Sequence, residues 1–147
     1  MGARTGAQFL EGLRRTRRQI WVDGEKIEDV TSHPKLRGAA ASLAAFFDRQ
    51  HAYADECLFE SPHSGQPINV SHMIPRTREA LRQRHAGLVR LSEGSMGIMG
   101  RTPDYMNMKF AAFASAPEVW AGADGRNAQG ARNLVAFQRR LAEQDFS

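Results

Sequence analysis

The sequence predicts a mainly α-helical protein with one or two small β-hairpins. Apolar residues recur at the three- and four-residue spacing of an amphipathic helix through most of the chain, and the few β-prone runs are short and flank turn residues. With 147 residues, of which 41% are hydrophobic and 24% charged, the chain has the size and composition of one globular domain. We therefore expect residues 1–147 to form a single helical domain.

Two helices are expected in the first third of the chain. Thr5 and Gln8 have the spacing of a capping box, in which the Thr hydroxyl and the Gln amide satisfy backbone N–H groups at a helix start. A second helix is expected to begin in the segment from Thr31 to Pro34. Its apolar stripe comprises Leu36, Ala39, Ala40, Leu43, Phe46, Phe47 and Gln50.

Two segments predict β-hairpins. In the run from Gln19 to Ile27, Asp23-Gly24 separates two β-prone stretches, and Asp-Gly favours a type I′ turn because both central residues need a positive φ. A second turn is expected over Ser61–Pro67. Its flanking strands would be Leu58-Phe59 and Ile68–Val70.

Three more helices are expected in the second half. One opens at Pro75–Thr77 and runs to about Met96, and its buried face is expected to comprise Leu81, His85, Leu88 and Met96. Thr102 at the N-cap and Pro103 at the first helical position predict a helix that ends near Ser115. The last helix is expected over about residues 127–144. Its apolar face would comprise Leu134, Phe137 and Leu141.

Charge, targeting signals and cysteine content exclude several classes of protein. The net charge of +4 is only mildly basic, and the chain has neither the apolar run of a signal peptide nor one long enough to span a bilayer. We therefore expect a cytoplasmic protein with no membrane partner. The single cysteine, Cys57, excludes an internal disulfide, and the five histidines lack zinc-ligand spacing, so no metal is expected.

Several further patterns have a functional and a structural interpretation. The arginines in 14–18 and 76–90 raise the possibility of nucleic-acid binding, but acidic residues interleave with them and no aromatic series accompanies them. A solvated face or an interface with acidic residues is favoured, and no nucleic-acid partner is expected. Gly94, Gly97 and Gly100 favour close packing at a helix end over a phosphate loop, and His85 favours a hydrogen-bonded core position.

Arg101, Asp104 and Tyr105 form the best small-molecule constellation. They lie at the start of the helix predicted from Pro103, where unpaired N–H groups carry partial positive charge. A guanidinium and a phenol donor there can bracket one oxyanion, such as a carboxylate or a phenolate, and Lys109 lies one turn further along the same face. The structural alternative is that Arg101 pairs with Asp104 or a helix end while Tyr105 packs in the core.

Several segments, read together, resemble a known family. They are the run from Arg4 to Leu10 (RTGAQFL), the hairpin WVDGE, the run DVTSHP that ends at Pro34, Ile74-Pro75-Arg76, and the block from Met99 to Tyr105 (MGRTPDY). In this order they are similar to the N-terminal domain of the 4-hydroxyphenylacetate 3-monooxygenase family, the oxygenase component of two-component flavin hydroxylases. The resemblance covers nearly the whole chain.

The resemblance implies an architecture like that of acyl-CoA dehydrogenases, in which a helical N-terminal domain precedes a β-barrel and a helical bundle in a homotetramer. It implies reduced FAD supplied by a separate flavin reductase, and hydroxylation of a phenolic substrate ortho to its oxygen. The family's substrate-binding Arg and Tyr match Arg101 and Tyr105, with Asp104 in the same block. No cysteine lies in that block, which disfavours the family's iron–sulfur dehydratase branch.

The resemblance also implies that parts of the complete enzyme lie outside this sequence. The family's substrate-contacting histidine follows the last predicted helix, and most flavin contacts come from the barrel and bundle. We therefore expect an N-terminal fragment or a truncated member of the family, inactive as an isolated chain. The leading hypothesis is a substrate-site-contributing domain of a phenol monooxygenase, and the alternative is a non-catalytic helical interaction module.

Overall fold

The computed structural model describes residues 2–16, 18–98 and 102–145. Its described elements are mainly helical with two small antiparallel hairpins, which confirms the expected fold class. In chain order they are α1 (Gly6–Arg15), β1 (Ile20–Val22), β2 (Glu25–Ile27), α2 (Arg37–Ala52), α3 (Ala54–Cys57), β3 (Leu58–Glu60), β4 (Pro67–Asn69), the 3₁₀ turn η1 (Val70–His72), α4 (Arg78–Glu93), α5 (Pro103–Ala114), α6 (Pro117–Ala121) and α7 (Ala128–Gln144).

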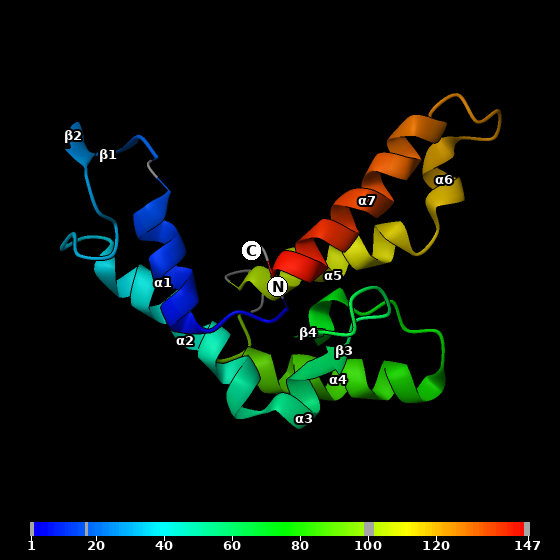
Figure 1. Cartoon of the computed structure of the whole chain (residues 1–147), viewed down its shortest axis with the longest axis horizontal. Helices are drawn as coiled ribbons and strands as arrows, with labels where there is room; N and C mark the ends of the chain where they lie inside the picture. The colour runs from blue at the N-terminus through cyan, green and yellow to red at the C-terminus, as the bar shows by residue number, and fades with distance from the viewer. Residues whose placement is uncertain (1, 17, 99–101, 146–147) are drawn as a thin grey trace.

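The elements form two arms that diverge from a common base (Figure 1). One arm consists of α1 and α2 with the β1–β2 hairpin at its tip, and the other consists of α5, α6 and α7. The base holds α3, α4 and the β3–β4 hairpin. The start of the chain passes between β4 and the end of α7, where Ala3 N donates to Pro67 O (2.7 Å) and Gly2 N donates to Glu143 O (3.1 Å).

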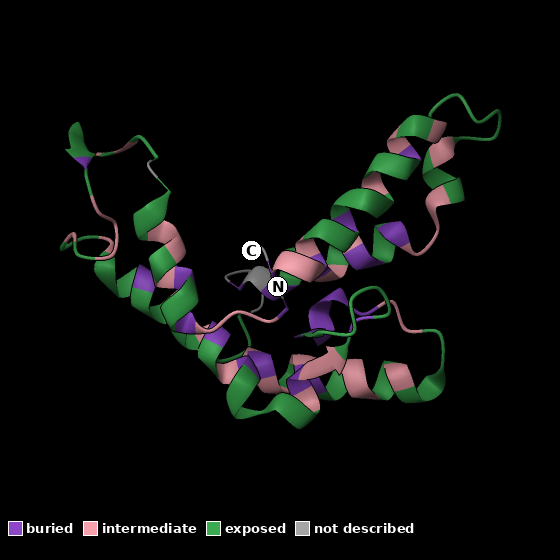
Figure 2. Ribbon diagram, viewed as in Figure 1, coloured by how far each residue is buried: buried purple, intermediate pink, exposed green. Residues whose placement is uncertain are grey.

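Buried residues gather at the base and between the paired helices of each arm, while much of the remaining surface is exposed (Figure 2). One apolar cluster lies between α1 and α2, where the rings of Phe9 and Phe47 stack at 4.9 Å. A second cluster lies in the base and comprises Cys57, Val70, Met73 and Leu91. None of the helices in the described part of the chain is long and apolar enough to cross a bilayer.

Local signals in the sequence correctly predicted the start of α1 and the positions of both hairpins. Thr5 and Gln8 form both hydrogen bonds of the capping box at α1. Asp23 and Gly24 have φ values of 52° and 82°, as a turn with two positive φ angles requires. The β3–β4 hairpin also forms where it was expected, with Phe59 paired to Ile68.

The expected start of α2 is wrong by several residues. The chain between Asp29 and Leu36 folds into turns, because the Asp29 carboxylate accepts hydrogen bonds from the backbone N–H of Thr31 (2.8 Å) and from its hydroxyl. His33 N donates to Asp29 O at 3.1 Å and continues these turns. The regular helix therefore begins at Arg37.

The expected buried face of α4 is also wrong. Leu81 and His85 are exposed, so His85 is not a core histidine. The helix instead turns Gly87 and Leu91 inward. Gly87 permits this contact because an added Cβ would lie 2.4 Å from the carbonyl oxygen of Glu56, in α3.

α4 ends at Glu93, three residues before the expected end at Met96. Gly94 takes the C-cap position, and an added Cβ there would lie 2.8 Å from the Phe46 ring, which supports the close-packing interpretation of this glycine. Met96 has a φ of 52° and is 90% exposed, so it does not extend the buried face. Gly97 has a φ of 84° and open space around it, and Gly100 lies outside the described residues.

The face that α7 buries differs from the expected one at Phe137, which is exposed. Ala131, Gln138 and Ala142 are the buried residues of this helix. Phe137 instead makes an edge-to-face contact with Phe110 of α5, with ring centroids 5.2 Å apart. The apolar face of α7 is therefore wider than the sequence pattern indicated.

Candidate functional site

The candidate site lies at the start of α5. Thr102 takes the N-cap position with an extended backbone (φ −111°, ψ 151°), and Pro103 opens the helix, as expected from the sequence. Arg101 lies outside the described residues, so its side chain takes no part in the geometry below. Asp104 and Tyr105 follow in the first turn of α5, where Asp104 is buried and Tyr105 is exposed.

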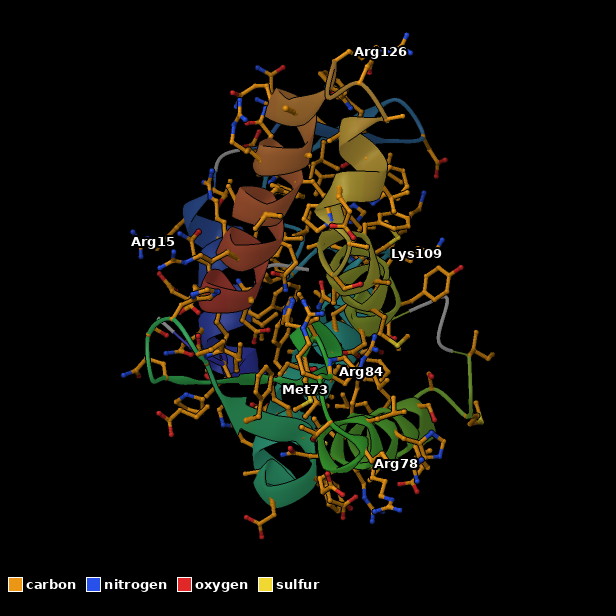
Figure 3. All side chains as sticks on the ribbon, turned by 90° about the vertical axis from the view of Figure 1, so that its right-hand side faces the viewer. Arg15, Met73, Arg78, Arg84, Lys109 and Arg126 are labelled. Atoms are coloured by element: carbon orange, nitrogen blue, oxygen red, sulfur yellow. The ribbon has the colours of Figure 1, made fainter. Side chains whose placement is uncertain are left out.

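Tyr105 lies on the outer face of α5, where 39% of the residue is exposed. The Lys109 ammonium lies over its ring, 4.3 Å from the centroid, in a cation–π contact. Figure 3 shows Lys109 projecting from α5 on the side away from α7. The two side chains thus form an accessible patch that offers a phenol hydroxyl beside a cation.

Asp104 faces the interior and is only 4% exposed. Its carboxyl is hydrogen-bonded to the Ser71 and Thr102 side chains. One turn later, Asn107 Nδ2 donates to Ser71 Oγ at 3.3 Å. Burial, reinforced by repulsion from Asp145, raises the pKa of Asp104 to about 6 despite these hydrogen bonds.

A hydrogen-bonded chain continues from Ser71 across the base of the molecule. Asn69 Oδ1 accepts from Ser71 N (2.8 Å), and Asn69 Nδ2 donates to Gln50 Oε1 (2.8 Å). Gln50, 1% exposed, donates from Nε2 to Asp145 Oδ2 (2.9 Å) and to the Arg4 carbonyl (2.8 Å). This polar cluster joins the first residues of the chain, α2, β4, η1, α5 and the end of α7.

A cavity of about 10 Å³ lies inside the polar cluster, which is room for about one water molecule. It is lined by Phe46, Phe47, Gln50, Asn69, Asp104, Asn107 and Asp145. The cavity is therefore too small for an organic substrate. Asp104 and Tyr105 consequently border two different spaces, the closed interior and the open face of α5.

The sequence did not predict the polar cluster. The helical period puts Gln50 on the apolar stripe of α2 and gives no sign of its polar partners. The signal that could have found Gln50 is the presence of a polar amide at a position where the helical period demands a buried side chain. No comparable local signal marks Asp145, whose partners Arg4 and Gln50 lie 141 and 95 residues away in sequence.

Other candidate residues have structural partners. Arg90 forms two 3.0 Å hydrogen bonds to the Glu56 carboxylate and a further ion pair to Glu93 at 3.1 Å, so part of the second arginine cluster binds acidic side chains within the chain. Cys57 is fully buried, and burial raises the pKa of its thiol to about 11, so little of the reactive thiolate is present near pH 7.

The helical fold and the MGRTPDY block are those of an N-terminal domain from a family of oxygenases. The chain belongs to the family of 4-hydroxyphenylacetate 3-hydroxylase N-terminal domains, whose model matches residues 5–147. This confirms the resemblance found in the sequence.

Similar proteins include the 4-hydroxyphenylacetate 3-monooxygenase oxygenase components of Geobacillus sp. and Thermus thermophilus, each 35% identical over 147 residues. The alignments cover 100% and 99% of this chain. A solved structure of such an oxygenase component, complexed with FAD and 4-hydroxyphenylacetate, is 34% identical, with a TM-score of 0.83 over 97% of this chain. The chain spans only about 29% of the length of each of these relatives.

Proposed function

We propose that this chain is the N-terminal, substrate-site-contributing domain of a reduced-FAD-dependent monooxygenase that hydroxylates a phenolic substrate ortho to its hydroxyl. The observation that carries the proposal is the outward-facing Tyr105 in the first turn of α5, with the Lys109 cation on its ring. Membership of the family supports it, as does the likeness to an oxygenase component complexed with FAD and 4-hydroxyphenylacetate.

In this proposal, Arg101 and Tyr105 hold the oxygen of the phenol. Arg101 directly precedes the N-cap of a twelve-residue helix, where unpaired backbone N–H groups favour negative charge. A guanidinium and a hydroxyl donor at that oxygen stabilise the phenolate and so lower the pKa of the bound phenol. The phenolate is richer in electrons at its ortho carbon, and the donors fix the ring so that this carbon faces the oxidant.

FAD, reduced and bound, would supply the activated oxygen. The exposed face of α5 fits the role of one wall of a phenol site and does not itself enclose a cofactor, because Tyr105 and Lys109 are both open to solvent. We therefore place the flavin in parts of a longer enzyme outside these 147 residues. A separate flavin reductase, a homotetrameric assembly and a cytoplasmic location complete the proposal.

In this proposal Asp104 orients the site and does not contact the substrate. Its carboxyl lies in the closed polar cluster, and its hydrogen bond with Ser71 ties the first turn of α5 to η1. That tie sets the direction in which the adjacent Tyr105 leaves the helix. Asp104 is thus a positioning residue for the phenol site, while Arg101 and Tyr105 are the residues proposed to touch the substrate.

A chimeric oxygenase tests the substrate role. The segment of the Geobacillus relative that matches this chain would be replaced by residues 1–147, and the product would be assayed with reductase, FAD and 4-hydroxyphenylacetate. We expect Tyr105→Phe to lower kcat/KM by about 10- to 150-fold, since a hydrogen bond to a charged oxygen is worth roughly 1.5–3 kcal/mol. The 147-residue chain alone is expected to give no product.

Tyr53→Phe is the matched control. Tyr53 is 37% exposed and also lies against cations, with Arg49 4.9 Å and Arg90 4.5 Å from its ring centroid, but it lies outside the proposed site. Its kcat/KM should stay within about twofold of the parent chimera, as for a surface change far from the chemistry. An assembled, FAD-binding chimera whose turnover is unaffected by Tyr105→Phe and Arg101→Ala would refute the substrate role.

One observation favours a second function, a helical interaction module. Phe113, Trp120 and Phe137 are exposed. Edge-to-face contacts run from Trp120 to Phe113, from Phe113 to Phe110 and from Phe110 to Phe137, and so form a continuous aromatic patch on α5, α6 and α7. Contiguous exposed apolar surface of this kind marks protein interfaces. Sedimentation of the chain alone distinguishes the two: a compact monomer at high concentration argues against the module.

A further inference from the structure

An apolar groove runs along α7 in the arm formed by α5, α6 and α7, and we refer to it as the α7 groove. Its volume is about 620 Å³. Figure 1 shows α6 beside α7 in this arm, and the two helices pack against each other. Much of the lining consists of alanines from the three helices, namely Ala114, Ala121, Ala128, Ala131 and Ala136.

The dimensions of the α7 groove are those of a site for a helix. It follows α7 from Ala128 to Arg139, which is about three turns and roughly 17 Å of helix. The small alanine side chains allow a second helix axis to approach to about 8 Å. One side of the groove is open, since Val135 and Ala136 are exposed. A small ligand would keep much of its surface in water there, whereas a helix needs to bury only one face.

The two walls of the α7 groove carry opposite charges. Arg132 and Arg139 lie on the α7 wall, and their seven-residue spacing places them nearly in line, about 10 Å apart. Arg132 Nη2 donates to the neutral Gln129 Oε1 at 2.8 Å, and neither guanidinium forms an ion pair within the described part of the chain. The α6 wall carries Glu118, which is exposed. The groove therefore offers two cations on one side and one anion on the other.

Two further ionisable side chains lie toward the base of the molecule. His63, in the β3–β4 turn, lines the groove and is exposed, so it adds a polar group at that end. Glu143 follows Arg139 by one helical turn but does not line the groove, and its carboxylate accepts a hydrogen bond from the Ser61 hydroxyl. The positive charge of Arg132 and Arg139 is therefore not neutralised within the α7 wall.

A second copy of this chain does not supply a matching helix. Pairing with both arginines needs two carboxylates that are also seven residues apart on one helix face. None of the helices in the described part of the chain carries two acidic residues at this spacing, and those of α4, Glu79 and Glu93, are fourteen apart. Charged walls around a small apolar centre are also typical of interfaces between separately folded proteins.

We propose that the α7 groove binds an amphipathic α-helix of a partner protein, with carboxylates seven residues apart along one edge of its apolar stripe. The stripe packs on the alanines and Val135, and the carboxylates pair with Arg132 and Arg139. A basic residue on the other edge pairs with Glu118, as flanking charges set partner choice in coiled coils. Neither Tyr105 nor the aromatic patch lines this groove, so the proposal goes beyond the proposed function and does not rest on it.

Three stapled helical peptides test the proposal by fluorescence anisotropy with the 147-residue chain. All carry the same leucine stripe, and two positions seven residues apart beside the stripe hold Glu, Gln or Lys. We expect the Glu peptide to bind about fivefold more tightly than the Gln peptide, the effect of two exposed ion pairs, and the Lys peptide to bind most weakly. Salt at about 1 M should bring the three affinities together, because it screens exposed charges.

The variant with both Arg132→Gln and Arg139→Gln should lose the preference for the Glu peptide and keep its affinity for the Gln peptide within about twofold. Arg78→Gln with Arg82→Gln is the matched control, because it removes the same charge from exposed positions of α4 and should keep the preference. Figure 3 shows Arg78 on α4, far from the tip of the arm that carries Arg126.

A bulky side chain in the groove tests the location of the site. Ala136→Trp, at an exposed alanine of the groove, should weaken binding of all three peptides about tenfold or more, because the indole occupies the place of the leucine stripe. Ala41→Trp, at an exposed alanine of α2, should not weaken it. If Ala136→Trp does not fold, the backbone ¹H–¹⁵N resonances of the wild-type chain decide, and they should shift along residues 128–139.

Several results would overturn the proposal. They are equal affinity for the Glu and Lys peptides, binding that survives in folded Ala136→Trp, and no binding of any peptide. Self-association that Ala136→Trp abolishes would place a second copy in the groove and would also overturn it. The chimeric oxygenase should bind the Glu peptide as the 147-residue chain does, and loss of binding there would show that the longer enzyme covers the groove itself, which contradicts a separate partner.

Discussion

Gly87 is expected to tolerate an added side chain poorly. In Gly87→Ala, the new Cβ would lie 2.4 Å from the Glu56 carbonyl oxygen and 2.6 Å from Val70 Cγ2. The first of these atoms is backbone, so no side-chain rotation relieves the contact, and α4 must move away from α3. Overpacking of this kind costs about 1–3 kcal/mol, and we take the upper end because the obstacle is rigid.

Helix propensity acts in the opposite direction, because alanine is favoured over glycine by about 1 kcal/mol inside a helix. The net expectation for Gly87→Ala is therefore a loss of about 2 kcal/mol in the free energy of unfolding. Urea unfolding followed by circular dichroism measures this difference, provided that the slope against denaturant is unchanged.

Gly38→Ala is the matched control, since Gly38 also lies in a helix, α2, but has nothing within 4 Å of an added Cβ. Only the propensity effect applies there, so this variant should gain about 0.5 kcal/mol. The opposite signs of the two substitutions separate packing from propensity. A Gly87→Ala variant as stable as the wild-type chain would contradict the inference that α3 lies too close to Gly87 for a Cβ atom.

Three further outcomes are expected. Burial raises the pKa of Asp104 to about 6, so the contribution of Asp104 to the free energy of unfolding is full at low pH and is lost as pH rises through 6. Burial lowers the pKa of His72 to about 4, so the contribution of His72 is full near neutral pH and is lost as pH falls through 4. Urea unfolding between roughly pH 4 and 6.5 compares each variant with the wild-type chain. Stability should rise more steeply with pH in Asp104→Asn and should fall with pH in His72→Phe. If both variants gave pH profiles parallel to that of the wild-type chain, both pKa shifts would be contradicted. Thr5→Ala should lose about 1 kcal/mol of unfolding free energy, because it removes the capping box of α1, and an unchanged urea midpoint would argue against the cap. Cys57 should react with a thiol reagent only as fast as the chain opens, so a rapid reaction of the native chain would contradict its burial.

The parts of the fold that the sequence predicted correctly depend on neighbours in the chain. A capping box needs only Thr5 and Gln8, and a turn with two positive φ angles needs only Asp23-Gly24. Pro103 also acts locally, since its fixed φ suits the first position of α5. In each case the interacting groups are at most three residues apart, so the sequence contains the whole interaction.

The error in α4 has a different origin. Apolar spacing favoured a face through Leu81 and Leu88, but burial in this helix is decided by how closely a neighbour can approach. Gly87 has no side chain, so α3 and η1 approach the backbone of α4 most closely at this residue, and this face is the buried one. Hydrophobic periodicity assigns glycine little weight, and so it points to the wrong face wherever close backbone contact decides the packing.

Helix geometry explains why the residues of the proposed phenol site lie on different faces of α5. Successive residues on an α-helix are about 100° apart, so Asp104 and Tyr105 cannot share one face even though the sequence block reads as one motif. The buried partner Ser71 draws Asp104 inward, and this rotation leaves Tyr105 facing outward beside Lys109. In this turn of α5, Asp104 thus attaches the helix to η1, and the next residue, Tyr105, presents its hydroxyl as a hydrogen-bond donor. Asp104→Asn, which keeps an acceptor for Ser71, should therefore preserve the orientation of Tyr105, whereas Asp104→Leu should release it and raise KM in the chimera together with a loss of stability.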